Sequence, residues 1–132
     1  MVRCSICRPA LRGAATLAIS GGLLLPGAGQ AVAGTRPAAP AAETACSGNT
    51  CQVVDSSGDT VTDWYTETTA PSAVCTYARY YANGTLVAET GTKCLSSGQE
   101  ATANWSNPGA FPSGTNLCSS WYGIAGEPCT RL

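Results

Sequence analysis

The stretch VCTYARYYANGTLVAET, residues 74–90, decides the fold class. It is rich in Val, Thr and Tyr, the residue types that fit the pleated surface of a β-strand. Asn83 and Gly84 divide it, and both tolerate the positive φ angles that a two-residue hairpin turn requires. Residues 74–82 and 85–90 are therefore predicted to form two antiparallel strands joined at this turn.

The same turn sets which residues face each other along the predicted hairpin. With Ala82 opposite Thr85, regular antiparallel pairing continues along both strands. In that register Cys75 and Cys94 fall on one face, a diagonal step apart. Diagonal neighbours lie near the outer limit of disulfide geometry, and a bulge at Gly91 would bring the two cysteines closer. We therefore expect a Cys75–Cys94 disulfide.

Strand chemistry recurs along the rest of the chain. Thr, Val, Tyr and Trp alternate with the turn residues Gly, Pro, Asn and Ser, and no segment has helical apolar spacing with a cap and a stop. Further strands are predicted at residues 52–54, 60–68, 100–105 and 115–122, with a loop at residues 107–114. Strands this short, separated by frequent turns, indicate a sandwich or a barrel. We expect an all-β domain, a small disulfide-stapled antiparallel β-sandwich of about six strands.

Residues 1–33 have the order of features of an export signal. Three arginines precede an uncharged run at residues 13–25, and an Ala-Val-Ala pattern typical of a cleavage site ends the segment. A single-pass anchor is the alternative, but the run is too short and too glycine-rich for a stable span. Residues 34–45, rich in alanine and proline, are predicted to be a linker. We expect a bacterial protein that is secreted to the extracellular space, with no membrane contact after signal cleavage.

The remaining residues, 46–132, are predicted to form the disulfide-rich β domain, too small for its core alone to supply much stability. They include six cysteines, and an even number in an exported domain indicates a disulfide framework. Zinc binding is the alternative, but the chain has no histidine and is predicted to leave the reducing compartment. Sequence alone does not choose among the pairings, and we favour neighbours along the chain. The predicted pairs are Cys46–Cys51, Cys75–Cys94 and Cys118–Cys129.

Charge and composition exclude several function classes. From residue 34 onward, four basic and eight acidic side chains give a net charge of −4, which disfavours nucleic acids and anionic membranes as partners. No histidine can act as a catalytic base, and all six cysteines of the domain can pair. We therefore expect no catalytic residue, no cofactor and no metal, in a protein that is not an enzyme and acts as a monomer.

Four carboxylates could indicate a catalytic or calcium site, because they recur every four residues. They are Asp55, Asp59, Asp63 and Glu67. That spacing gathers side chains on a helix but not on a strand, and a glycosidase needs two carboxylates that converge in a cleft. A calcium loop is a second alternative, but the spacing and the closing glutamate of an EF-hand loop are missing. An Asx-type turn accounts better for this segment.

Aromatic residues are numerous for so small a domain. On strands, the members of three adjacent pairs point to opposite faces, so one ring of each pair lies outside or against another sheet. These pairs are Trp64-Tyr65, Tyr80-Tyr81 and Trp121-Tyr122. The loop at residues 107–114 is stiffened by two prolines, and a stiff loop loses little entropy on binding. Ordinary core packing and a plain surface loop are the alternatives. The candidate binding residues are Trp64, Tyr65, Arg79, Tyr80 and Phe111.

A triplet on the predicted hairpin, Ala78-Arg79-Tyr80, and the pair Trp64-Tyr65 carry a family resemblance. The chain resembles small secreted actinobacterial proteins and, loosely, the tendamistat-like α-amylase inhibitors. Those proteins are cysteine-paired β-sandwiches with an aromatic–Arg–aromatic triplet on a hairpin. Here alanine replaces the first aromatic residue, which puts amylase inhibition in doubt. The resemblance implies a Cys51–Cys75 disulfide, in conflict with the pairing of neighbours.

Three functions remain open. The first is a non-catalytic secreted protein that binds an extracellular protein or glycan through surface aromatics and a stiff loop. The second is an inhibitor of a secreted hydrolase, an amylase or a protease. The third is a small secreted toxin or enzyme, for which the sequence offers no placed catalytic base.

Overall fold

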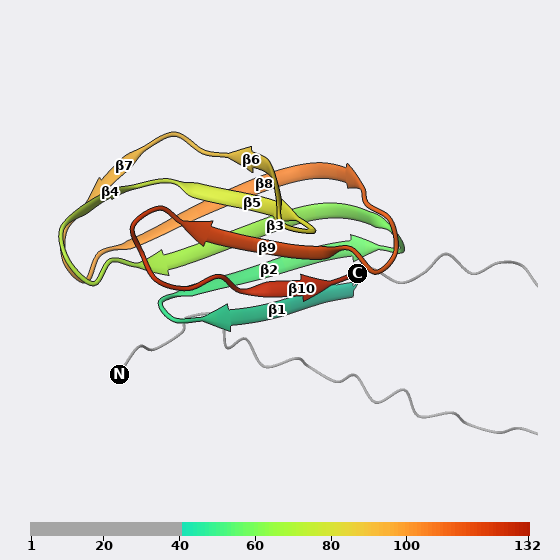
Figure 1. Cartoon of the computed structure of the whole chain (residues 1–132), viewed down its shortest axis with the longest axis horizontal. Coiled ribbons are helices and arrows are strands. Elements are labelled where there is room, and N and C mark those ends of the chain that lie inside the picture. The colour runs from blue at the N-terminus through green and yellow to red at the C-terminus, as the bar shows by residue number, and fades with distance from the viewer. Residues whose placement is uncertain (1–40) are drawn as a thin grey trace, which may run out of the picture. The chain divides into compact units, whose positions relative to one another are not determined.

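Strands make up most of residues 41–132, the part of the chain that the computed structural model describes (Figure 1). No helix occurs among these residues, so the prediction of an all-β domain is confirmed. The predicted export signal and the first part of the linker lie outside the described residues. The strands, in chain order, are β1 (Ala41–Ser47), β2 (Thr50–Ser57), β3 (Thr60–Thr69), β4 (Val74–Thr76), β5 (Ala78–Ala82), β6 (Thr85–Glu89), β7 (Lys93–Leu95), β8 (Glu100–Ala110), β9 (Asn116–Trp121) and β10 (Cys129–Arg131).

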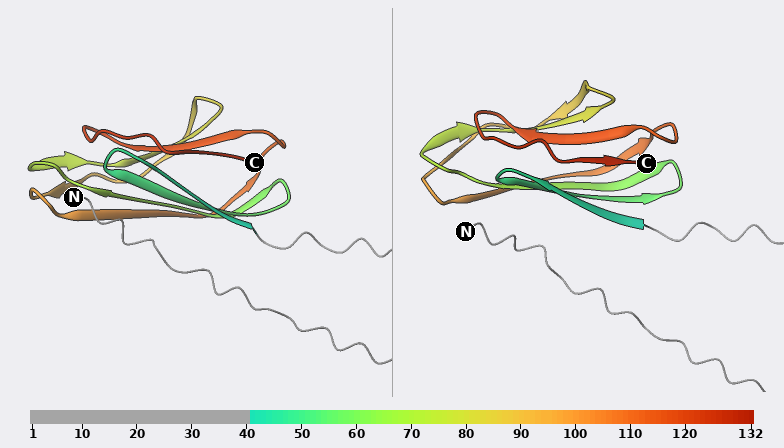
Figure 2. Two further views of the ribbon diagram at one scale, coloured as in Figure 1. Left: turned by 90° about the horizontal axis from the view of Figure 1, so that it is seen from below. Right: turned by 60° about the horizontal axis from the view of Figure 1, so that its bottom comes forward.

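The strands form two four-stranded sheets and one small two-stranded sheet, all antiparallel. The first sheet has the order β1-β2-β3-β8, the second has the order β10-β9-β5-β6, and β4 pairs only with β7. The two larger sheets form two layers (Figure 2), and the side chains that meet between them form the core. This is the predicted sandwich, with ten strands where about six were expected.

The predicted hairpin is formed by β5 and β6. Asn83 and Gly84 have φ angles of 48° and 79°, as the two-residue turn requires. Ala82 faces Thr85 as expected, but the register shifts by one residue further along, where Val87 has no partner on β5. This bulge was not predicted, because nothing in the local sequence distinguishes Val87 from its neighbours.

A second register shift brings two cysteines face to face. Arg79 faces Glu89, whereas Cys75 faces Cys94, so one more residue is inserted between β6 and β7. The insertion falls within residues 91–92, in agreement with the expected bulge at Gly91. It separates the predicted strand over residues 74–82 into β4 and β5.

The first strand, β1, lies partly in the segment that was assigned to the linker. Its residues pair with β2 in unbroken antiparallel register, so the predicted domain boundary at Cys46 is too late. The turn that follows packs closely on another part of the backbone. A Cβ on Gly126 would lie 2.0 Å from the Ser47 carbonyl oxygen, so only glycine fits there. Pairing and this contact hold β1 in place, and the alanine-rich composition does not indicate either.

The strand β8 extends into the predicted loop at residues 107–114. It continues to Ala110, with an irregular pairing around Asn107, whose φ angle is 53°. Pro108 is tolerated because β8 is an edge strand and its pairing with β3 is irregular at this point. The stiff loop is therefore shorter than expected.

Three disulfides join the six cysteines of the domain. They are Cys46–Cys51, Cys75–Cys94 and Cys118–Cys129, as the pairing of neighbours predicted. Each bridge joins two residues that face each other directly across an antiparallel pair of strands. The Cys51–Cys75 bridge implied by the resemblance is not formed.

One end of the core is aromatic. Trp64 is fully buried, with its ring centroid 5.1 Å from that of Tyr80 in an edge-to-face contact and 6.0 Å from that of Trp105 in a stacked one. Phe111 closes this end, 6.3 Å from Trp64. We call this group, which also includes Val54 and Val61, the aromatic end.

The other end of the core is polar. Gln52 is fully buried and donates to the Leu117 carbonyl oxygen at 2.9 Å and to Thr130 Oγ1 at 3.1 Å, while its Oε1 accepts from Trp64 Nε1 at 3.1 Å. Thr66 Oγ1 donates to the Cys51 carbonyl oxygen at 3.1 Å and lies 3.0 Å from Ser119 Oγ. We call the buried residues Thr50, Gln52, Thr66, Thr68 and Ser119 the polar end.

Candidate binding surface

Two of the predicted binding residues are in the core. Trp64 and Tyr80 have relative exposures of 0% and 1%, so they cannot act as surface aromatics. The alternation rule correctly separated them from Tyr65 and Tyr81, but it did not say which member of each pair points inward. Both inner rings belong to the aromatic end of the core.

The other aromatic candidates do not lie together. Phe111 is half-buried and packs against the core. Tyr65 points outward from β3, on the first sheet, where its hydroxyl donates to Glu67 Oε2 at 3.2 Å. Partial burial, followed by the nearby Glu67 carboxylate, raises the pKa of Tyr65 above its usual value. Arg79 points outward from β5, on the second sheet, so the five predicted residues form no common surface.

Arg79 instead lies against two tyrosines that were not among the candidates. Its guanidinium carbon is 4.8 Å from the ring centroid of Tyr77 and 5.1 Å from that of Tyr122. The two rings are stacked on each other, with centroids 5.1 Å apart and planes inclined by 9°. We call Tyr77, Arg79, Tyr81 and Tyr122 the tyrosine–arginine cluster.

Hydrogen bonds tie the arginine to the rings. Arg79 Nη2 donates to the Tyr77 hydroxyl, and bonding to Tyr77, then to Tyr81, raises the pKa of Arg79 above its usual value. Among residues 41–132, Arg79 Nε is buried and has no hydrogen-bond partner. Glu89 faces Arg79 on β6, yet neither it nor any other carboxylate of these residues forms an ion pair with the guanidinium. The positive charge is therefore shared only with phenol oxygens and rings.

The backbone around Tyr122 explains why the two rings stack. Tyr122 follows β9, and its N–H donates to the Tyr77 carbonyl oxygen at 3.0 Å. The buried Thr76 hydroxyl donates to the Tyr122 carbonyl oxygen at 2.6 Å. These bonds fix Tyr122 beside β5, and its side chain remains 53% exposed. The stack is thus built on a rigid sheet and open to solvent on one side.

Sequence reasoning could have found part of this cluster. Tyr77, Arg79 and Tyr81 recur every second residue, which places them on one face of a strand. Tyr122 lies 45 positions from Tyr77 in the sequence. Its place in the cluster depends on the pairing of β5 with β9, which no local pattern indicates.

The carboxylates at positions 55, 59, 63 and 67 do not converge. Asp55 and Asp63 face each other across β2 and β3, and Asp59 lies in the turn between those strands. Glu67 is four residues beyond Asp63 on β3, a separation of about 13 Å at the rise of a strand. Only Asp55 and Asp63 are therefore neighbours, and the row of four carboxylates as a whole does not gather at one point.

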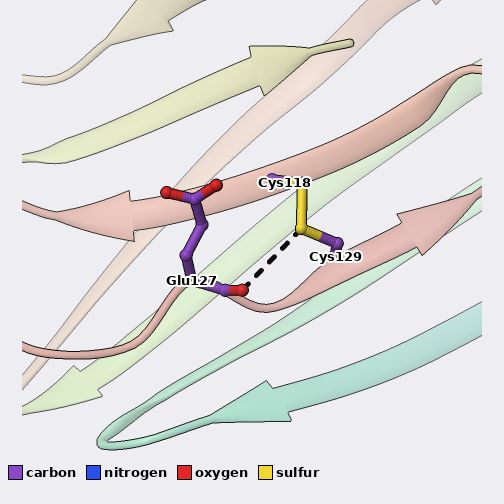
Figure 3. Close-up of side chains that lie close together, drawn as sticks. All are labelled: Cys118, Glu127 and Cys129. Atoms are coloured by element: carbon purple, nitrogen blue, oxygen red, sulfur yellow. Dashed lines mark hydrogen bonds between the residues drawn. A yellow bond between two sulfur atoms is a disulfide. The ribbon is translucent and has the colours of Figure 1, made fainter. Parts of the chain in front are cut away.

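One further group of side chains has the composition of a metal site. Cys118, Glu127 and Cys129 place their ligand atoms within 4.8 Å of one another. Figure 3 shows that the two sulfur atoms are bonded to each other, with Cys129 Sγ 3.7 Å from the backbone carbonyl oxygen of Glu127. A disulfide has no thiolate to offer a metal, so this group leaves a single carboxylate as ligand.

Comparisons with known proteins identify no relative. The chain matches no family model, no curated protein and no solved structure. Within residues 41–132, no helix is long and apolar enough to span a membrane. The resemblance to the tendamistat-like inhibitors therefore stays a prediction, and function is inferred from the geometry of this chain alone.

Proposed function

We propose that this chain is a secreted, non-catalytic binding protein that engages an extracellular protein or glycan through the tyrosine–arginine cluster. The observation that carries the proposal is an outward-facing arginine that lies against two stacked tyrosines and has no ion pair among the described residues. Secretion is supported by the predicted export signal and by three disulfides, which persist in oxidising compartments.

The cluster is suited to binding because its charged side chain, Arg79, is already held in one position before a partner binds. A free arginine loses considerable side-chain entropy when a partner immobilises it. Arg79 is already held by two rings and by the Tyr77 hydroxyl. Tyrosine and arginine, together with tryptophan, are also enriched among the residues that dominate protein interfaces.

The unused hydrogen-bond donors define the chemistry of the partner. A guanidinium carries five N–H donors, of which Tyr77 takes one on Arg79 Nη2 and the one on Nε is buried, so the donors open to a partner are the others on Nη1 and Nη2. Because Tyr77 accepts from Arg79, its own O–H group is left to donate elsewhere. Donors therefore dominate this surface, and it favours a partner that presents carboxylate, carbonyl or hydroxyl oxygens.

Inhibition of a secreted hydrolase is a second candidate, favoured by one specific observation. Tyr77, Arg79 and Tyr122 form an aromatic–Arg–aromatic arrangement in space, although they come from two strands rather than from one triplet. Such an arrangement is what the tendamistat-like inhibitors carry on a hairpin. An inhibitor would lower the activity of an amylase or a protease when mixed with it at micromolar excess.

The test compares two tyrosine variants on opposite faces of the sandwich. The chain is exported with its own leader, purified from the medium, and screened against a glycan array, culture-medium proteins, and a panel of amylases and proteases. We expect Tyr122→Ala to weaken any binding by about tenfold or more, since it removes a half-exposed ring from the cluster.

The matched control is Tyr65→Ala, which removes a tyrosine from the outer face of the first sheet and should leave binding unchanged. Equal binding by wild type and Tyr122→Ala, with loss in Tyr65→Ala, would place the site on the other sheet and refute the proposal. Retention of the chain inside cells would refute secretion.

A further inference from the structure

The three disulfides differ in how far their sulfur atoms are shielded. Cys75 and Cys94 are both exposed to solvent. In each of the other bridges one partner, Cys46 or Cys129, is exposed, and the other, Cys51 or Cys118, is buried with a relative exposure of 4%. Thiol–disulfide exchange requires a thiolate to reach a sulfur atom, so access favours Cys75–Cys94.

The bridges also differ in the sheet that surrounds them. Cys75 and Cys94 join β4 to β7, a two-stranded sheet of only three residue pairs at one end of the domain (Figure 1). The other two bridges each join an edge strand of a four-stranded sheet to its neighbour, over seven residue pairs for β1 and β2 and over three for β10 and β9. An isolated pair of short strands is marginally stable, so local opening around Cys75–Cys94 is easier than opening of either larger sheet.

The number of residues between the paired cysteines also favours reduction of Cys75–Cys94 over the other two bridges. The separation is 19 residues for Cys75–Cys94, 11 for Cys118–Cys129 and 5 for Cys46–Cys51. After one sulfur of the bridge is attacked, the displaced thiolate can attack the mixed disulfide, expel the reductant and re-form the bridge. The rate of this step depends on the effective concentration of the two sulfur atoms, which falls as a flexible intervening chain lengthens. Where the short strands around a bridge have opened, the longest loop recaptures most slowly, and this favours reduction of Cys75–Cys94.

From these three differences we propose that Cys75–Cys94 is a thiol–disulfide exchange site, opened by a dithiol reductant while the other two bridges remain closed. One thiolate of the dithiol attacks the exposed sulfur of Cys94, forms a mixed disulfide and displaces the thiolate of Cys75. The second thiol of the reductant then attacks the mixed disulfide and displaces Cys94. Two electrons pass to the protein, which gains two thiols, and the reductant becomes a disulfide.

The opened state keeps the rest of the sandwich. Leu95 and Thr76 remain anchored, since Leu95 is buried in the core and the Thr76 hydroxyl is bonded to the Tyr122 carbonyl oxygen. The change is therefore local and reversible. It reaches the tyrosine–arginine cluster because Cys75 precedes Tyr77 by two residues, so exchange loosens the segment that leads into the stacked rings.

The test is selective reduction of the folded, exported chain. The protein is incubated with increasing dithiothreitol at neutral pH without denaturant, quenched with N-ethylmaleimide, and mapped by peptide mass spectrometry. We expect Cys75 and Cys94 to be labelled together and at least about tenfold faster than the other four cysteines. Simultaneous labelling of all six cysteines, or prior labelling of another bridge, would overturn the proposal.

Two further measurements distinguish exchange from unfolding. Far-UV circular dichroism should be unchanged at the point where only Cys75 and Cys94 are labelled, and its loss at that point would show global unfolding instead. The double variant Cys75→Ser/Cys94→Ser should show no labelling under the same conditions. In the matched double variant Cys46→Ser/Cys51→Ser, Cys75 and Cys94 should still be labelled at the wild-type rate. Faster labelling would show that the Cys46–Cys51 bridge controls access to Cys75–Cys94.

Discussion

Buried polar side chains gather at one end of the core, where one of them bonds to Trp121, and buried rings gather at the other. Along β2 and β3 the facing inward pairs change from Thr50 with Thr68, through Gln52 with Thr66, to Val54 with Trp64. At the polar end, buried oxygen and nitrogen atoms meet in directed hydrogen bonds. At the aromatic end, contact between rings replaces those bonds, and the buried Tyr80 hydroxyl has no partner among the described residues.

This difference separates two tasks of a thin core. Ring packing removes apolar surface from water and depends only loosely on direction. A buried hydrogen-bond network tolerates a single arrangement, because a one-residue slip of either sheet leaves buried groups without partners. The polar end therefore fixes how the two sheets sit on each other, and the aromatic end supplies much of the burial.

Of the substitutions proposed in the two ends of the core, replacing Gln52 should lower the free energy of unfolding the most. Gln52→Leu keeps similar bulk but leaves Trp64 Nε1 and the Leu117 carbonyl oxygen without their partner. We expect a loss of about 3 kcal/mol in the free energy of unfolding, because each abandoned buried group costs about 1–3 kcal/mol. Urea unfolding, monitored by tryptophan fluorescence, measures this loss.

A double-mutant cycle isolates the cause. Trp64→Phe removes the abandoned N–H group, so Gln52→Leu should cost clearly less in that background than in wild type. An equal cost in both backgrounds would show that the Gln52–Trp64 hydrogen bond contributes nothing, and the division of the core into two tasks would fail.

Replacing Thr66 should have a smaller effect. Its hydroxyl donates to the Cys51 carbonyl oxygen and accepts from Trp121 Nε1 at 3.3 Å, and Ser119 Oγ lies within hydrogen-bond distance. Thr66→Val preserves the shape and should lower the free energy of unfolding by about 1–2 kcal/mol. Chemical denaturation measures this loss. A matched change on the outer face, Thr62→Val, should cost less than about 0.5 kcal/mol, and an equal loss in both variants would contradict the role of the network.

Removing the Tyr80 hydroxyl should have the smallest effect at neutral pH. Tyr80→Phe deletes a buried group that has no partner, so stability should be unchanged or slightly higher. A loss above about 1 kcal/mol would mean that the hydroxyl has a hidden partner, such as a bound water.

Alkaline pH sharpens the same test. Burial raises the pKa of Tyr80 in the folded state, with a further contribution from Asp63, so the phenol ionises first in the unfolded chain. The neutral Tyr80 phenol makes its full contribution to the free energy of unfolding below the pKa that a tyrosine has in the unfolded chain, about 10. As the pH rises above that value, the free energy of unfolding falls by up to about 1.4 kcal/mol per pH unit. Wild type should therefore lose stability above pH 10 more steeply than Tyr80→Phe, in denaturation curves recorded from pH 8 to 12. Parallel curves would contradict the raised pKa.

The sequence predicted what local chemistry controls. Asn83-Gly84 fixed a hairpin because the turn and the flanking residues lie within one short stretch, and the cysteine pairing followed from that hairpin. The strand β1 was missed because its alanine-rich residues have little preference for strands and are held by their neighbours. The bulge at Val87 likewise had no local signal.

The candidate site was predicted only in part, for a related reason. Arg79 was among the candidates and points outward, whereas Trp64 and Tyr80 are buried and the rings of Tyr77 and Tyr122 lie beside Arg79 instead. Alternation along one strand distinguishes two faces without telling which is covered. That choice is made by the opposite sheet, which supplies the partners that surround Trp64 and Tyr80.

The order of the disulfides has a consequence for how the chain matures. Each bridge joins consecutive cysteines of the domain, and no bridge spans another. On the proposed export route, a chain that emerges from a translocation channel from its N-terminus can close each bridge as soon as the second cysteine appears. Native pairing then needs only an oxidase acting in order, with no isomerase to correct earlier pairs. Because the three cysteine pairs follow one another along the chain, their order in the sequence is also the order in which the disulfides can form.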